Sequence, residues 1–253
     1  MDILRFFKRM TNILLPPHCV CCQEPITGDV ALCATCWKKL SLFHTPWCAR
    51  CGTPLNFELP GENICEECSR KFIHIFDGAR SVAAYQGSAR TLVLKLKHAD
   101  AAYLAPLMGS LMQRAIKDLK NVDYVIPVPL HWRRLLKRKY NQSALLAYYL
   151  TKKRHLPYAP SFLKRHRATP SQKGHNAQER YENVEGAFSV TKKGYLALER
   201  KNVLLIDDVW TTGATLTSCT KTLRKAGVSK VYVLTFARVL KGEALVRLSE
   251  DTL

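Results

Sequence analysis

Short apolar runs alternate with longer amphipathic stretches from residue 79 onward. The apolar runs have the length of buried strands and lie at 81–85, 124–128, 203–206 and 231–236. The amphipathic stretches have the length of helices and lie at 89–98, 102–119, 142–151 and 214–225. A polar stretch separates residue 151 from residue 203. Strands and helices in this succession predict an α/β fold, a parallel sheet with helices on both faces.

The first seventeen residues carry a different pattern. Their apolar side chains share one face at helical spacing and are Ile3, Phe6, Phe7, Met10 and Leu14. Arg5, Lys8 and Arg9 interrupt the apolar run and no small-residue cleavage site follows, so the segment is not a signal peptide. We expect an amphipathic helix that packs on the body, with contact to a membrane surface as the alternative. No apolar run is long enough to span a bilayer, so we expect no stable membrane insertion.

Nine of the ten cysteines lie before residue 70, and only Cys219 lies beyond it. This asymmetry predicts two domains, 1–75 with the cysteines and the amphipathic helix, and 76–253 with the sheet. Eight of the nine form CxxC pairs, which are Cys19/Cys22, Cys33/Cys36, Cys48/Cys51 and Cys65/Cys68. Because each pair turns two thiolates toward one point, two pairs complete a tetrahedral zinc site.

Sequential pairing is the most economical assignment, with the first two pairs on one zinc ion and the last two on another. An interleaved arrangement uses the same residues, and in the sequence CVCC the extra Cys21 could replace Cys22. All-cysteine sites are closed and structural, so we predict two structural zinc ions in a double zinc ribbon. Disulfides and an iron–sulfur cluster are the alternatives. The regular pairing and the lack of an export signal favour zinc in a reducing cytoplasm.

The formal net charge is +19, and one fifth of the chain carries most of it. Residues 131–180 contain thirteen lysines and arginines against one acid, a local charge of +12. Such a basic block attracts polyanions, because each neutralised phosphate releases condensed counterions. A solvated basic loop, or a pocket for a small anion, would explain the same charge.

Residues 203–215 read VLLIDDVWTTGAT, an apolar strand followed by two acids and a loop of small residues. The loop amides and the dipole of the following helix form a nest for phosphate. Asp207 and Asp208 lie at the carboxyl end of the strand, where they suit ribose hydroxyls and the magnesium ion that accompanies a pyrophosphate. The signatures of P-loops and of dinucleotide-binding folds are absent from this segment. A chance Asp-Asp turn before a helix is the alternative.

This segment resembles the phosphoribosyl-pyrophosphate motif of type I phosphoribosyltransferases, a hydrophobic strand and two acids before a Thr-Thr-Gly-x-Thr loop. The resemblance implies a type I phosphoribosyltransferase-like fold for 76–253 and phosphoribosyl pyrophosphate (PRPP) with Mg²⁺ as the ligand. It also implies that Asp207 and Asp208 hold the ribose hydroxyls. The loop that would wrap the 5′-phosphate consists of Thr211, Thr212, Gly213, Ala214 and Thr215.

Three further features are similar to the ComF family of amidophosphoribosyltransferase-like proteins. The first is the segment IPVPLHWRRLLKRKYNQSALLA at 126–147, in which Asn141-Gln142 opens a helix. The second is the spacing of Arg167, Thr169, Gln172, Arg180, Asn183 and Phe188. The third is the cysteine-rich head, which YQGSARTLVLKLKHAD joins to the body. The resemblance covers nearly the whole chain. It implies a role in natural transformation, the handling of incoming single-stranded DNA in the bacterial cytoplasm. A competence helicase or recombination protein is a candidate partner.

The chain departs from this family at one turn. The family commonly has Arg-Gly-Phe-Asn-Gln where this chain has Arg138-Lys139-Tyr140-Asn141-Gln142, so a lysine stands at a position that is normally glycine. This puts the shape of the turn in question and adds positive charge beside it.

Several basic residues are candidates for contact with pyrophosphate or DNA, namely Arg133, Arg134, Arg138 and Lys173. Lys173 lies in a polar stretch at 164–180 that we expect to act as a mobile flap over the site. Lys95, Lys97 and His98 resemble another basic element of the family, and a solvated helix face is the alternative.

Two classes of function use the same residues. In the first, the body is a Mg²⁺-dependent phosphoribosyltransferase acting on a small base or amine. In the second, which we favour, the protein binds PRPP and handles single-stranded DNA, because a charge of +12 exceeds what a small anion requires. The aromatic candidates for base stacking are Trp132, Tyr140, Tyr148, Tyr149 and Tyr158. A zinc-bearing scaffold for a partner protein is a third class, and no residue is identified as catalytic.

Overall fold

The computed structural model describes residues 16–27, 31–56, 63–70, 75–98, 100–116, 119, 121–168 and 177–240. The amphipathic helix predicted near the N-terminus and Lys173 of the predicted flap lie outside these residues. Among the described residues, no helix combines the length and the apolar character that crossing a bilayer requires.

Four parallel strands form the main sheet. They are β1 (Gly78–Ala84), β2 (Tyr124–Pro127), β5 (Asn202–Trp210) and β6 (Lys230–Arg238), in the order β1-β6-β5-β2. Each strand runs parallel to its neighbour, so the predicted parallel sheet is confirmed. β5 is longer than predicted, because it continues through Asp207 and Asp208 to Trp210.

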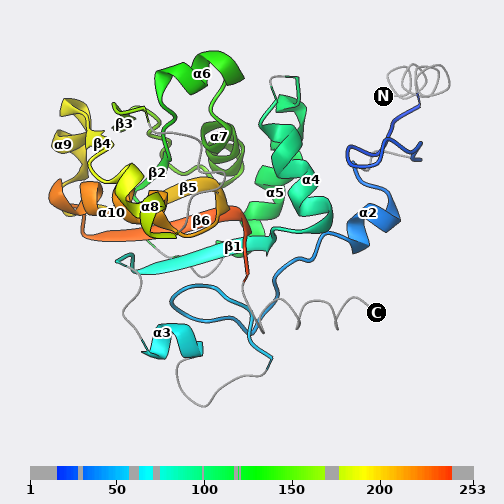
Figure 1. The fold of residues 1–253 in the computed structure, drawn as a ribbon, viewed down its shortest axis with the longest axis horizontal. Helices are drawn as coiled ribbons and strands as arrows, with labels where there is room; N and C mark the ends of the chain where they lie inside the picture. The colour runs from blue at the N-terminus through cyan, green and yellow to red at the C-terminus, as the bar shows by residue number, and fades with distance from the viewer. Residues whose placement is uncertain are drawn as a thin grey trace.

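Helices cover both faces of this sheet because side chains alternate along its strands. The helices are α4 (Gly87–Leu96), α5 (Ala105–Ala115, preceded by the 3₁₀ turn Ala102–Leu104), α7 (Gln142–Arg154) and α10 (Ala214–Lys225). On β5, Leu204 and Ile206 share a core with α4, α5 and α7, whereas Val203 and Leu205 share one with α10. Figure 1 shows α4, α5 and α7 grouped together, apart from α10.

Several short elements were not predicted from the sequence. They are α6 (Trp132–Arg138), β3 (Leu163–Arg165), α8 (Ala177–Val184), β4 (Phe188–Val190) and α9 (Lys192–Leu198). β3 and β4 pair antiparallel in a second, two-stranded sheet. Their few apolar side chains, Leu163, Phe188 and Val190, are buried in the same core as α10. Packing therefore stabilises elements that are too short to give a periodic signal.

The cysteine-rich head packs directly on the body. The helices described in the head are α2 (Ala34–Lys38) and α3 (Glu66–Arg70), and each begins within a CxxC pair. Between the ribbons, Leu42 pairs antiparallel with Ala83 of β1, and the Phe43 amide donates to the Val82 carbonyl over 2.8 Å. Gly52 lies so close to β1 that a Cβ there would be 2.5 Å from the Ala79 carbonyl oxygen. The boundary near residue 75 stays a prediction.

Candidate functional site

The 211–215 loop joins β5 to α10 and turns on a glycine. Gly213 is the N-cap of α10 and has φ +83°, a left-handed conformation that favours glycine. A Cβ at this position would lie 3.0 Å from Nε1 of Trp210. The loop is held from the other side by Tyr181 of α8, whose hydroxyl donates to the Thr212 carbonyl over 3.0 Å. The start of α10 therefore lies beside a tightly packed turn, where the Ala214 amide donates to Oγ1 of Thr212 over 3.4 Å and the helix dipole favours an anion.

Asp207 and Asp208 precede this loop. The Ser143 hydroxyl donates to Oδ1 of Asp207 over 2.8 Å, and the Asp208 amide donates to the same oxygen over 2.9 Å. Nζ of Lys97 lies 3.4 Å from Oδ2 of Asp208. Burial and then the neighbouring Asp208 charge raise the pKa of Asp207, which these hydrogen bonds and Lys97 lower, and the net result is a pKa of about 7. A cation placed between the two carboxylates would relieve this repulsion.

The start of α7 places Ser143 at this site. Asn141 caps the helix by accepting from the Ser143 amide over 3.1 Å, and its side-chain amide donates to the Val128 carbonyl over 3.0 Å. The helix predicted to open at Asn141-Gln142 is therefore present. Because Asn141 also bonds the end of β2, the first turn of α7 is fixed against the carboxyl end of the sheet.

The turn between α6 and α7 has the left-handed backbone that the glycine of the family pattern favours. Lys139 has φ +63°, in the left-handed region where glycine is favoured. The hydroxyl of Tyr140, the next residue, donates to the carbonyls of Leu96 and His98 over 2.8 and 2.6 Å. The turn thus keeps a glycine-like conformation although a lysine occupies it, at a cost of about 1 kcal/mol.

The basic residues of α6 lie near the same end of the sheet. Arg133 is exposed, and the Arg138 guanidinium donates to Oε1 of Gln142 over 3.0 Å. Burial lowers the pKa of Arg134, and the Arg138 charge lowers it further. Arg165 of β3 belongs to this group, because burial and then the Arg134 charge lower its pKa while the Asp207 charge opposes them. From the sequence Arg165 was predicted only as part of the 164–180 flap, because β3 is too short to show a periodic pattern.

The predicted basic helix face at the end of α4 is engaged in contacts. Nζ of Lys95 donates to the carbonyls of Val20 and Cys21 over 2.7 and 3.2 Å. Lys97 pairs with Asp208, whereas His98 is exposed. The last turn of α4 therefore joins the first cysteine pair to the acids of β5.

Two groups of four cysteines gather in the head, in the sequential pairing. The first tetrad is Cys19, Cys22, Cys33 and Cys36, and the second tetrad is Cys48, Cys51, Cys65 and Cys68. Within each tetrad the four Sγ atoms lie within 4.8 Å of one another. The Sγ atoms of Cys22 and Cys33 are 3.7 Å apart and those of Cys51 and Cys65 are 3.6 Å apart.

These distances fit zinc and exclude disulfides among the described cysteines. Tetrahedral Zn–S bonds of about 2.3 Å separate the sulfurs by roughly 3.8 Å, whereas a disulfide needs about 2.05 Å. All ten cysteines are free thiols in the structure. The two tetrads are thus consistent with two structural zinc sites. Cys21 lies outside both, with its thiol 3.9 Å from the Ser88 carbonyl.

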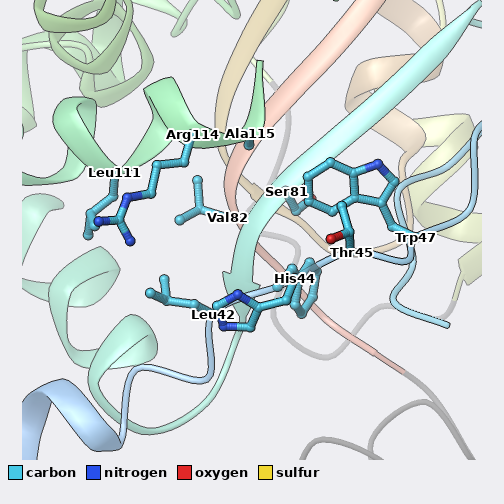
Figure 2. Close-up of a pocket in the computed structure, with 10 residues that line it drawn as sticks. Leu42, His44, Thr45, Trp47, Ser81, Val82, Leu111, Arg114 and Ala115 are labelled. Carbon is cyan, nitrogen blue, oxygen red and sulfur yellow. The ribbon is translucent and has the colours of Figure 1, made fainter. Parts of the chain in front are cut away.

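A cavity of about 270 Å³ lies elsewhere, between the segment that joins the two ribbons, β1 and α5. Its lining includes Trp47, Val82 and Arg114, which Figure 2 shows around a common space. None of the residues that line it was predicted as a site residue.

Known proteins resemble both the cysteine-rich head and the chain as a whole. Residues 10–69 match the double zinc ribbon domain family. Competence protein F of Haemophilus influenzae is 31% identical over 230 residues, which cover 87% of this chain and 96% of that protein. DNA utilization protein YhgH of Escherichia coli O157:H7 is 28% identical over 236 residues, 90% of this chain and 100% of that protein.

Solved structures of phosphoribosyl enzymes superpose more distantly. Glutamine phosphoribosylpyrophosphate amidotransferase from B. subtilis matches with 20% identity and a TM-score of 0.37. The match covers 54% of this chain and 27% of that one, so this chain spans about a quarter of the enzyme's length. The parallel sheet itself, and not this superposition, defines the fold.

Proposed function

This chain belongs to the competence protein F family, and on that premise we propose that it binds PRPP with Mg²⁺ and handles single-stranded DNA during natural transformation. The observation that carries the proposal is the juxtaposition of the 211–215 loop, the two acids of β5 and the basic residues of α6. A phosphate nest, a divalent-cation site and a basic surface lie at one end of the same sheet.

The ligand half of the proposal rests on the loop and the acids. The 5′-phosphate would accept from amides at the start of α10, where the helix dipole favours negative charge. Asp207 and Asp208 would bind the ribose hydroxyls and the magnesium ion, which neutralises the pyrophosphate charge. Ser143 keeps the Asp207 carboxylate in place. A magnesium ion bound by Asp208 would compete with the ion pair between Lys97 and Asp208.

The DNA half rests on α6, all of whose residues are at least partly exposed. Trp132 is 57% exposed, and the Arg133 guanidinium carbon lies 5.3 Å from the centroid of its ring. An exposed indole next to a cation is a platform on which a base can stack. In Figure 1 α6 lies above α7 at the top of the molecule, where a strand could reach it.

The tyrosines that the sequence offered as stacking residues divide into two groups. Tyr140 and Tyr158 donate their hydroxyls to backbone carbonyls, Tyr158 to that of Ala144 over 3.0 Å. Tyr149 packs against the core, while Tyr148 is 43% exposed. Trp132 and Tyr148 are therefore the aromatic residues that we assign to base stacking.

A salt titration tests the DNA half. Binding of a single-stranded oligonucleotide should weaken steeply as salt rises, and R133A/R134A should lower the affinity about tenfold and reduce the salt slope by about two charges. K192A/K193A is the matched control, because it removes the same charge from exposed lysines of α9, apart from α6 in Figure 1. Equal losses in both variants, or binding that ignores salt, would exclude a specific role for α6.

Calorimetry with Mg²⁺-PRPP tests the ligand half. D207A/D208A should abolish binding while the protein stays folded. An active transferase is the second candidate, and the contact of Tyr181 in α8 with the 211–215 loop favours it, since α8 covers one side of the loop and could help to exclude water from the ligand. Release of pyrophosphate from PRPP with a panel of bases and amines would establish turnover. Binding without release would leave PRPP as a regulator.

A further inference from the structure

Arg238, at the end of β6, is a buried cation. It is 7% exposed, and one of its guanidinium nitrogens donates to the Cys51 carbonyl over 2.7 Å. Among the described residues no carboxylate pairs with it. A buried charge without a counter-charge is strongly destabilising, so an opposite charge is expected nearby.

The second tetrad supplies that opposite charge when it holds its metal. Four thiolates carry more negative charge than one zinc ion neutralises, so the loaded site is an anion. Cys51, whose carbonyl accepts from Arg238, is one of its ligands. A second buried arginine, Arg80, also donates to this part of the head, to the Ala49 carbonyl over 3.0 Å. The two arginines are thus placed as counter-ions of the second tetrad.

The other face of Arg238 lies against Trp210. Its guanidinium carbon is 3.9 Å from the centroid of the indole, and Phe76 packs edge-on against the same ring at 5.3 Å. Trp210 is buried and lies under the 211–215 loop, where a Cβ on Gly213 would be 3.0 Å from the indole nitrogen. The backbone is tied as well, since the Val239 amide donates to the Trp210 carbonyl over 2.8 Å.

These contacts form a continuous path from the second tetrad through Arg238 and Trp210 to Gly213. We infer that Arg238 is a positioning residue that makes the shape of the 211–215 loop depend on the metal in the second tetrad. Loss of that metal removes the counter-charge of Arg238 and loosens the support under the loop. The inference rests on the proposed function, because the loop's role is to bind the phosphate of PRPP.

Hydrogen exchange of the 211–217 segment without ligand tests this path directly. R238Q keeps a donor for the Cys51 carbonyl but removes the charge and the flat cation on Trp210, so exchange in the segment should rise about tenfold. Zinc content should stay that of the wild type, and the Kd for Mg²⁺-PRPP should rise about tenfold. Chelation of the wild-type metal should raise exchange in the same segment.

K95M is the matched control, because Lys95 donates to the Val20 and Cys21 carbonyls beside the first tetrad and is connected through α4 to Asp208, not to the 211–215 loop. It should leave exchange at 211–217 unchanged. If R238Q fails to fold, R238K and W210F carry the test, since each weakens the stacking while keeping a buried cation. Unchanged exchange in the Arg238 variants, or an equal rise in K95M, overturns the inference. A wild type that binds no PRPP would reject the proposed function, while the exchange result would still decide the role of Arg238.

Discussion

The two cysteine tetrads share one ligand set but differ in their surroundings. In the first tetrad Cys22 is exposed. The nearby cation is Lys95, which is half-buried and donates to the Val20 and Cys21 carbonyls. The second tetrad lies beside the buried arginines Arg80 and Arg238. Both tetrads contribute cysteines to a core, but the first has an exposed member that solvent can reach, whereas buried cations lie beside the second.

The tetrads also reach different halves of the candidate ligand site. From the first, Lys95 leads along α4 to Lys97 and thus to Asp208, on the ribose side. From the second, Arg238 leads through Trp210 to Gly213, on the phosphate side. Each ribbon thus supports one element of the site from a different face of the sheet.

Removing metal ligands should separate the two tetrads most clearly. C48S/C51S leaves Arg238 without a counter-charge in the core that holds β5 and α10, and should destabilise folding by about 4 kcal/mol or prevent it. C19S/C22S should cost about half as much, because Cys22 is exposed and no buried arginine in the described part of the chain depends on the charge of the first tetrad. Thermal melts with zinc analysis measure both. Equal losses would show that the two environments do not matter.

Much of this comparison could be predicted from the sequence, and some could not. CxxC spacing identified all eight cysteines of the two tetrads, and the apolar runs identified the four strands of the main sheet, because both signals are local. Arg238 could not be linked to Cys51, which lies 187 residues away, nor Arg165 to the acids of β5. Contacts of this kind depend on which strands become neighbours, and no periodic pattern records that order.

The stability of the protein should depend on pH through the ionisation of Asp207, on the ribose side of the candidate site, and D207N tests this. The folded-state pKa of Asp207 is about 7 against 3.8 for an unperturbed aspartate, so its ionisation opposes folding and stability falls as pH rises between these values. Asparagine can still accept from Ser143 but carries no charge. At pH 8 D207N should be more stable than the wild type by about 1 to 2 kcal/mol, and by less at pH 5.

Melting temperatures at the two pH values measure this difference, and calorimetry should show that D207N no longer binds Mg²⁺-PRPP. The wild type should bind more tightly as pH rises through 7, because the bound cation requires the ionised carboxylate. A D207N protein that is less stable than the wild type at pH 8 would contradict the assigned protonation of Asp207.

The smallest effect concerns Cys21, which the CVCC sequence offered as a replacement for Cys22. Its thiol points to the Ser88 carbonyl at 3.9 Å, while Cys22 lies 3.7 Å from Cys33 inside the first tetrad. C21S should therefore keep the wild-type zinc content and change the free energy of unfolding by less than about 0.5 kcal/mol. C22S should lose zinc from the first tetrad even though Cys21 is present. Retention of that zinc in C22S, with loss in C21S/C22S, would show instead that Cys21 can replace Cys22 as a ligand. The second tetrad has no such replacement, because its CxxC pairs contain no extra cysteine.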